Sequence, residues 1–280
     1  MKTYPIGVLI PFGANTDIEK EFQKAKDLEL ESCQLCIWDS TLYENREYAE
    51  RIRTTAEKMN FTVSALWAGW SGPCEWNFTG GPATIGLVPE AYRAMRLNEL
   101  KAASDFAEWI GVNKMITHVG FIPENPDHPD FNGVVTALRW LCGYMKKKGQ
   151  TFLFETGQET PVTMLRTIQA IGTGNLGINF DTANLILYGK ANPLDALDVF
   201  GKYVMNTHIK DGLFPTDGME LGKQMPVGEG RADVEGVIRK LTALGYNGPM
   251  TIEREISGDQ QIKDIKNTRD MLREIYTRLD

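Results

Sequence analysis

The feature that most constrains the fold of this 280-residue chain is a regular alternation of short apolar runs with longer amphipathic segments. The runs are rich in Val, Ile, Phe or Thr and are mostly apolar throughout, which is typical of strands covered on both faces in a parallel sheet. The eight predicted strands are Tyr4–Ile10, Ser32–Trp38, Phe61–Trp67, Lys114–Val119, Thr151–Thr156, Leu176–Asp181, Tyr203–Ile209 and Pro249–Arg254.

An amphipathic, helix-type pattern follows each run. The eight predicted helices are Thr16–Leu30, Tyr43–Met59, Pro89–Ile110, Asn132–Lys148, Pro161–Ile171, Pro193–Phe200, Ala232–Leu244 and Ile262–Leu279. Eight strand–helix units without a linker or a shift in composition predict an α/β fold, with a single (β/α)₈ TIM barrel over residues 1–280. A doubly wound open sheet is the alternative, and eight regular units without a split favour closure.

Composition and charge argue against several classes of partner. The net charge of −7 makes a nucleic acid an unfavourable partner. No stretch approaches the roughly 18 apolar residues of a membrane-spanning helix. The first residues, MKTYPIGVLIPFG, read as a strand rather than a signal peptide, so we expect a cytoplasmic protein.

Two sequence motifs are interpreted as structural. Cys33 and Cys36 form a CxxC within a strand-like run, where residues three apart point to opposite faces, so we expect two buried thiols. The segment Gly172–Gly177 matches the dinucleotide pattern GxGxxG. It follows a predicted helix and precedes a predicted strand, the reverse of the order that phosphate binding requires. It therefore predicts a helix-stop loop.

Polar side chains gather where the predicted strands end, which is where (β/α)₈ barrels carry their active sites. Strands four to eight end in Thr117-His118, Glu155-Thr156, Asn179-Phe180-Asp181, His208-Ile-Lys210-Asp211 and Glu253-Arg254-Glu255. Carboxylates that converge near the barrel axis would repel one another and lose hydration unless a cation joins them. The predicted ligands of one divalent metal are Glu155, Asp181, His208 and Glu253, a set that suits Mn²⁺, Mg²⁺, Co²⁺ or Zn²⁺.

Each of these four residues also has a purely structural interpretation. Glu155 can form a salt bridge across the barrel mouth, Asp181 can cap the loop that follows it, and His208 can be a hydrogen-bonded core residue. A metal site explains all of them together.

Aromatic residues are expected to complete the site. Trp38 and Trp67 end the second and third strands, and we expect both to contact substrate because aromatic faces pack well on the C–H faces of sugars. Trp70 and Trp76 lie in the long loop 68–89, which could close over the site as a lid. The alternative is that some tryptophans form an oligomer interface or a hydrophobic rim.

Five segments carry a resemblance to a known family. FETGQET, NFDTANLI, THIKDG, PVGEGRAD and GPMTIERE, in this order, resemble the xylose isomerase-like barrel superfamily. More narrowly, they resemble its sugar (phosphate) isomerase/epimerase branch, which includes ketose 3-epimerases, hydroxypyruvate isomerase and inosose dehydratase. The resemblance implies one metal, most often Mn²⁺, held at the four positions named above. It also implies that Glu155 and Glu253 exchange a proton with the substrate through an enediolate.

The chain departs from the family pattern at two places. Asn184 stands where family epimerases often carry a histidine three residues after the strand-six aspartate. Lys210 and Asp211 follow the strand-seven histidine, where an arginine is common a few residues on, and the nearest arginine is Arg231. We expect His118, Asn184, Lys210 and Arg231 to bind substrate, with Lys210 able to stabilise a developing oxyanion. A purely structural role is the alternative for Asn184 and Lys210.

The predicted function is a divalent-metal-dependent sugar isomerase or epimerase that abstracts the α-proton of a ketose or keto-sugar. The alternatives are a dehydratase or lyase on a keto-inositol or keto-sugar at the same metal site, and a non-catalytic sugar-binding barrel. The expected partner is a small sugar, with no nucleic acid or membrane. A homo-oligomer is compatible with the sequence.

Overall fold

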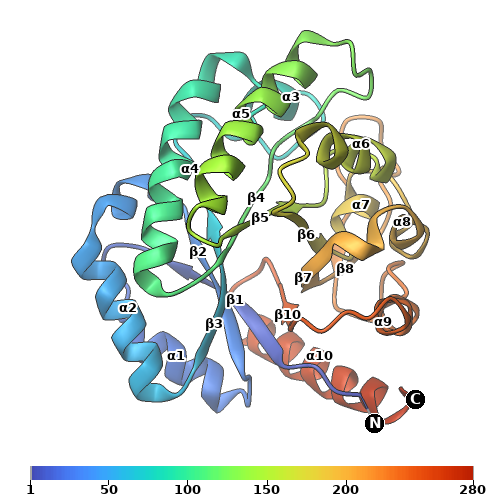
Figure 1. The fold of residues 1–280 in the computed structure, drawn as a ribbon. Coiled ribbons are helices and arrows are strands. Elements are labelled where there is room, and N and C mark those ends of the chain that lie inside the picture. The colour runs from blue at the N-terminus through green and yellow to red at the C-terminus, as the bar shows by residue number, and fades with distance from the viewer. Residues whose placement is uncertain (1, 280) are drawn as a thin grey trace.

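The computed structural model describes residues 2–279, and at its centre is a closed barrel of eight parallel strands (Figure 1). Around the barrel the strands follow the order β1-β10-β7-β6-β5-β4-β3-β2. Their bounds are β1 Ile6–Phe12, β2 Ser32–Ile37, β3 Thr62–Ala68, β4 Lys114–Thr117, β5 Thr151–Glu155, β6 Leu176–Asp181, β7 Val204–Ile209 and β10 Met250–Ile252. The predicted (β/α)₈ barrel is confirmed, and all eight predicted strands are present.

One long helix follows each barrel strand and packs on the outside of the barrel (Figure 1). These helices are α1 Ile18–Asp27, α2 Arg46–Met59, α4 Glu90–Ile110, α5 Pro129–Lys146, α6 Pro161–Ile171, α8 Pro193–Phe200, α9 Val234–Ala243 and α10 Asp259–Thr277. Local chemistry determines where several begin: the side chains of Asp17, Thr160 and Asn192 cap α1, α6 and α8. The main hydrophobic core lies between this helical layer and the strands.

The structure adds six short elements that the sequence pattern did not predict. They are η1 Ser40–Glu44, α3 Gly81–Thr84, α7 Asn184–Leu187, η2 Gly201–Tyr203, β8 Asp211–Gly212 and β9 Gln224–Met225. Strands β8 and β9 pair antiparallel within the segment that connects β7 to α9. Elements of two to five residues are shorter than the window in which periodicity can be detected.

The two motifs that were interpreted as structural behave as predicted. Cys33 and Cys36 are buried and form no disulfide, with Cys33 in the outer core and Cys36 in a small cluster inside the barrel. Gly172 ends α6 in the left-handed conformation (φ 67°), and β6 begins a few residues later. The GxGxxG match is therefore a helix-stop loop. Among the described residues, no helix has the length and apolar character needed to cross a membrane.

Candidate metal centre and active site

The four predicted metal ligands lie together at the carboxyl ends of neighbouring strands. Glu155 ends β5, Asp181 ends β6, His208 lies in β7 and Glu253 follows β10. One ligand atom from each lies within 4.8 Å of the corresponding atoms of the others. All four side chains are buried. The strand order of the barrel thus brings together residues that are separated by up to 98 positions in the chain.

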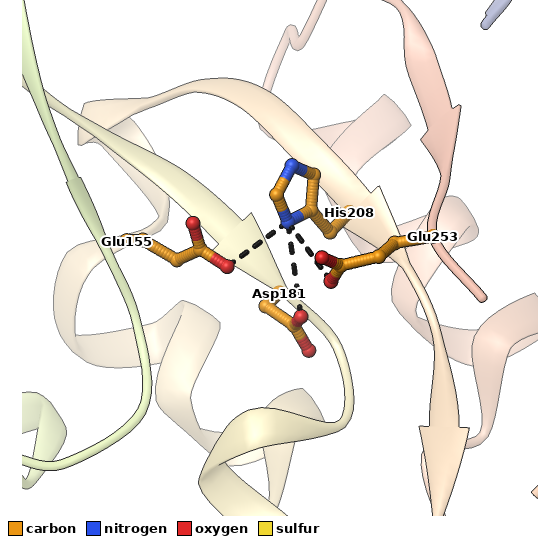
Figure 2. Close-up of side chains that lie close together, drawn as sticks. All are labelled: Glu155, Asp181, His208 and Glu253. Carbon is orange, nitrogen blue, oxygen red and sulfur yellow. Dashed lines mark hydrogen bonds and ion pairs between the residues drawn. The ribbon is translucent and has the colours of Figure 1, made fainter. Parts of the chain in front are cut away.

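All three carboxylates point toward the same nitrogen of His208 (Figure 2). Nδ1 lies 3.0 Å from Glu155 Oε1, 3.2 Å from Glu253 Oε2 and 3.8 Å from Asp181 Oδ2. Glu155 and Glu253 lie on opposite sides of this nitrogen (Figure 2). The geometry is that of a cluster of ligands around a common point.

Asp181 uses its two oxygens differently. Oδ1 accepts hydrogen bonds from the backbone N–H groups of Ala183 and Asn184, each at 2.7 Å, so the carboxylate caps the start of α7. Oδ2 is buried and has no hydrogen-bond partner. The ammonium of Lys210 lies 3.6 Å from Oδ2, too far for a hydrogen bond. A buried carboxylate oxygen without a hydrogen bond is costly, and a cation at the cluster would satisfy it. The structural interpretation of Asp181 as a cap and its prediction as a ligand are therefore compatible.

A glutamine inside the barrel, Gln34 of β2, orients His208. Its amide nitrogen lies 3.4 Å from the carbonyl oxygen of Thr207 and 3.0 Å from Oδ1 of Asn179, both acceptors. Its carbonyl oxygen Oε1 therefore faces His208 Nε2, at 2.6 Å, and accepts the proton of that nitrogen. With a proton held on Nε2, Nδ1 is the ring nitrogen that would bind a metal, in place of the proton that the glutamates attract there. Gln34 was not identified from the sequence. The clue to its role was a single amide side chain within an otherwise apolar predicted strand.

The electrostatics of the cluster reflect crowded carboxylates in a buried place. Burial raises the pKa of Asp181 to about 8. Burial also opposes ionisation of Glu155 and Glu253, but neighbouring groups outweigh it and lower the pKa of each carboxyl below its usual value. The neighbours are His208 and His118 at Glu155, and Lys210 and His208 at Glu253. Burial alone would lower the pKa of His208, and the adjacent glutamates raise it well above its ordinary value. The cluster attracts positive charge, whether a proton or a metal.

This donor set fits a divalent metal ion. Three carboxylates and an imidazole are ligands that Mn²⁺, Mg²⁺, Co²⁺ and Zn²⁺ accept. Three features are consistent with an ion at the centre of the cluster: Oδ2 of Asp181 has no hydrogen bond, His208 Nδ1 faces all three carboxylates, and the ligand atoms lie close together. The four residues can therefore hold a metal, whose identity the donor set leaves open.

A cavity of about 420 Å³ opens above the cluster. Five of the six residues predicted to bind substrate line it: Trp38, Trp67, His118, Asn184 and Lys210. Arg231 does not line it, because it lies exposed in the loop before α9, where its backbone N–H donates to the carbonyl of Gly212. A role for Arg231 in substrate binding therefore stays a prediction that the shape of this cavity does not support.

Polar cavity residues hold the two glutamates in place. The indole nitrogen of Trp67 donates to Glu155 Oε2, and Asn184 Nδ2 lies 3.4 Å from Glu155 Oε1. The ammonium of Lys210 lies 3.2 Å from both Asn184 Oδ1 and Glu253 Oε2. These contacts join the glutamates in one network, in which Asn184 links Glu155 to Lys210.

The loop between β3 and α4 forms an aromatic wall of the cavity. Trp76 from this loop lines the cavity beside Trp38, with 6.2 Å between the ring centroids. Arg96 of α4 is completely buried behind the loop and donates to the carbonyl oxygens of Ser71, Pro73, Thr84 and Gly86 at 2.7–3.0 Å. Its guanidinium also stacks on the ring of Trp70, at 4.2 Å from the centroid. These contacts favour a fixed wall over the lid expected from the sequence.

The barrel and the cluster at the carboxyl ends of its strands define a class: (β/α)₈ proteins with a candidate metal centre where such barrels carry their active sites. The chain belongs to the xylose isomerase-like TIM barrel family, whose model matches residues 22–275. The resemblance seen in the sequence motifs is thereby confirmed at the level of the family.

The chain is similar to two other proteins. A xylose isomerase domain protein from Planctomyces limnophilus has a solved structure that is 33% identical to this chain, with a TM-score of 0.91. That match covers 99% of this chain and 98% of the other. An uncharacterized protein of Methanocaldococcus jannaschii is 28% identical over 116 residues, which is 41% of this chain and 36% of that relative.

More distant structures share the fold. The 3-keto-D-glucoside 4-epimerase of E. coli is 14% identical with a TM-score of 0.71, and the match covers 97% of this chain and all of that one. A xylose isomerase-like TIM barrel protein from Mycobacterium smegmatis, in complex with magnesium, is 17% identical with a TM-score of 0.72. That match covers 99% of this chain and 97% of the other. At such identities the likeness shows the fold alone.

Proposed function

We propose that this protein is a divalent-metal-dependent sugar isomerase or epimerase that acts on a ketose or keto-sugar. The observation that carries the proposal is the pair of buried glutamates, Glu155 and Glu253, on opposite sides of His208 Nδ1 at the floor of a cavity. Two facing carboxylates beside a metal site can abstract a proton next to a carbonyl and return it. The sugar epimerase among the structural neighbours is compatible with this chemistry.

Glu155, Asp181, His208 and Glu253 would hold one metal ion, with Mn²⁺ as the first expectation and Mg²⁺, Co²⁺ or Zn²⁺ as alternatives. When bound, such an ion supplies Lewis-acid polarisation of the substrate carbonyl and its neighbouring hydroxyl. The magnesium complex of the Mycobacterium smegmatis neighbour supports a divalent cation in this fold.

The two glutamates would move the proton. One carboxylate removes the α-proton of the substrate, which leaves an enediolate. The other, after taking up a proton from solvent, delivers that proton from the opposite side. Although burial opposes their ionisation, the nearby positive groups lower the pKa of both carboxyls, so each is available as a base near neutral pH. The roles exchange with the direction of the reaction.

Three neighbours would support this transfer. Trp67 and Asn184 hold the Glu155 carboxylate through one hydrogen bond to each oxygen, which fixes the direction of its lone pairs. Lys210 is buried beside Glu253, where its ammonium can stabilise negative charge on a substrate oxygen. His118 Nε2 lies 3.5 Å from Glu155 Oε1, and its Nδ1 has no partner, so this ring can donate to or accept from a substrate hydroxyl.

Solvent-proton exchange tests the proposal directly. The Mn²⁺-loaded protein is incubated in D₂O with a panel of ketoses, keto-sugars and inososes and followed by NMR. We expect deuterium at the carbon next to the carbonyl, together with a new epimer or isomer. Loss of water to an unsaturated product would establish a dehydratase. Metal-loaded protein that exchanges no proton would contradict catalysis on this class of substrate.

Glu155→Gln should reduce α-proton exchange by at least about 100-fold, because it removes one general base. It should also weaken metal binding while leaving the barrel folded, since it removes a charge from a crowded cluster. The control is Glu235→Gln, which alters a partly exposed carboxylate on α9 that is ion-paired with Arg239 and Arg278. Exchange at a near-normal rate in Glu155→Gln would refute the assigned acid/base pair.

A further inference from the structure

The segment that follows β7 contains a ring of backbone N–H groups around a buried carboxylate. Asp211 Oδ2 accepts from the N–H groups of Gly228 at 2.9 Å and Gly230 at 3.0 Å. Asp211 Oδ1 accepts from Gly212 at 2.8 Å and Ala232 at 2.9 Å. The glycine-rich stretch 226–232 therefore folds around an anion that the chain itself supplies.

The same ring cannot also serve as a phosphate site. In (β/α)₈ enzymes the loops after strands seven and eight frequently bind phosphate through backbone N–H groups. Here Asp211 is 3% exposed and takes four of the N–H groups. A Cβ on Gly230 would lie 2.1 Å from Asp211 Oδ1, which shows how closely the loop surrounds the carboxylate. No room is left for a second anion.

The charges that line the cavity do not favour an anionic ligand either. Its lining includes two cations, Lys210 and Arg254, and both are already paired. Lys210 contacts Glu253 at 3.2 Å and Glu255 at 2.6 Å, and Arg254 contacts Asp264 at 2.8 Å.

Negative charge also exceeds the positive charge that is available to balance it. Four carboxylates lie at or below the cavity: Glu155, Asp181, Glu253 and Glu255. A divalent cation together with Lys210 would leave one of these four charges unbalanced. A phosphate group would therefore meet net repulsion in this site.

The cavity instead offers apolar surface. Trp38 and Trp76 line it, and each is 40% exposed although both are large and hydrophobic. Their rings meet edge to face, with 79° between the planes, so they form a corner. Aromatic faces of this kind match the C–H faces of a sugar ring or chain.

We infer that the substrate of this site is an uncharged sugar without a phosphate group, held with its C–H face against Trp38 and Trp76. The inference rests on the proposed function and names its substrate class. The observations behind it are the occupied N–H ring at Asp211, the paired cations of the cavity and the exposed tryptophan corner.

The test compares free ketoses with their phosphate esters, for example D-fructose with D-fructose 6-phosphate and D-ribulose with D-ribulose 5-phosphate. Binding is measured by tryptophan fluorescence in metal-free and Mg²⁺-loaded protein, and α-deuterium exchange is followed in parallel. We expect the free sugars to bind, and the esters to bind roughly a hundredfold more weakly because like charges meet in a desolvated site. Inorganic phosphate should not displace the free sugar.

Variants locate the binding site. Trp38→Leu and Trp76→Leu should each weaken binding of the free sugar about five- to tenfold, the loss expected for one aromatic face. The matched control is Trp140→Leu, because Trp140 is 49% exposed on α5 and does not line the cavity. Equal effects of all three substitutions would contradict the tryptophan corner.

The outcomes separate this inference from the proposed function. If the phosphate esters bind more tightly or exchange faster than the free sugars, the inference of an uncharged substrate would be overturned. The isomerase or epimerase proposal would remain intact. Free sugars that bind at Trp38 and Trp76 without exchanging a proton would support the uncharged ligand and overturn the catalytic proposal. Binding of neither member of any pair would overturn the inference.

Discussion

At the scale of single residues, Gln34 and His208 show how an amide can orient a candidate metal ligand. Because Gln34 Oε1 accepts from His208 Nε2, the other ring nitrogen faces the carboxylates and is the one that can bind a metal once it has lost its proton. The candidate ligands could be picked out from the sequence, since charged residues at strand ends are conspicuous. Gln34 could not, because its role depends on a partner 174 positions away that only the closed barrel brings near.

Gln34→Leu should lower metal affinity by roughly 10- to 100-fold, because the ligand His208 loses the contact that sets its tautomer and ring orientation. It should also lower the free energy of unfolding by about 1–3 kcal/mol, because the polar groups that now bond to the amide would stay buried without a hydrogen-bond partner. Isothermal titration with Mn²⁺ and thermal unfolding measure the two effects. Gln150→Leu is the control, because Gln150 is equally buried but bonds to Ser104 outside the site. Equal metal affinity in both variants would contradict the role of Gln34.

Glu159, in the loop after β5, should make the folding stability of the protein depend on pH. Burial raises the pKa of this carboxyl from 4.5 to about 8, and its Oε1 has no partner. Between these two pH values the unfolded chain ionises while the folded chain keeps the proton, so this group lowers stability as the pH rises. Glu159→Gln removes the penalty, and its stability relative to the parent should grow from pH 4.5 to pH 8.

Urea unfolding at several pH values measures this difference. The control with the opposite sign is Glu235→Gln, because the hydrogen bonds and charges of Arg278 and Arg239 lower the pKa of Glu235. The ionised Glu235 stabilises the fold at pH values above the ordinary pKa of a glutamate. Glu235→Gln should therefore be no more stable than the parent at neutral pH. A Glu159→Gln advantage that stays constant across the pH range would contradict a protonated Glu159.

At the scale of elements, the loop between β3 and α4 illustrates what a sequence pattern leaves out. Its length and tryptophans suggested a lid, but Arg96 binds four of its carbonyl oxygens from behind. An arginine in the first half of a predicted helix reads as an exposed residue. It is buried because the loop folds over it and supplies the acceptors that its guanidinium needs.

Arg96→Met should destabilise the protein by about 3 kcal/mol or more, because several buried carbonyls lose their donor. It should also release the loop, so that limited proteolysis cuts within residues 71–86 and sugar affinity falls with the displaced Trp76. The control is Arg139→Met, since Arg139 is exposed and bonds the carbonyls of Ala170 and Ile171 at the end of α6. An uncut loop in Arg96→Met would show that other contacts hold it.

At the scale of the whole molecule, metal binding and folding stability should be linked. Three buried carboxylates at one point cost free energy that a divalent cation would offset. When the free metal concentration is about a hundredfold above the dissociation constant, metal binding should stabilise the fold by about 2.7 kcal/mol. This corresponds to a rise of roughly 5–10 °C in Tm. A chelator should reverse the gain.

Asp181→Asn provides the comparison for that experiment. The amide can still accept the N–H groups of Ala183 and Asn184 through its oxygen, but it offers no anionic oxygen to a metal. The metal-dependent rise in Tm, followed by scanning calorimetry with and without EDTA, should be lost in this variant. A rise of equal size in Asp181→Asn would place the bound ion elsewhere.

The sequence by itself determined the barrel and the four candidate ligands. The barrel followed from eight repeated units, because apolar runs of strand length between amphipathic helices have few other ways to bury their faces. The ligands followed because a charged residue at the end of a buried strand needs a partner. Both conclusions depend on local patterns, which a single chain displays without its fold.

The tertiary structure decided what depends on contacts between distant segments. It brought Gln34 to His208, buried Arg96 behind a loop and placed Arg231 outside the cavity. It also placed Asp211 inside the glycine-rich loop, so that the backbone N–H groups of this loop donate to a carboxylate of the same chain and are not free to bind phosphate. Such contacts follow from strand order and loop paths, which residue periodicity does not encode.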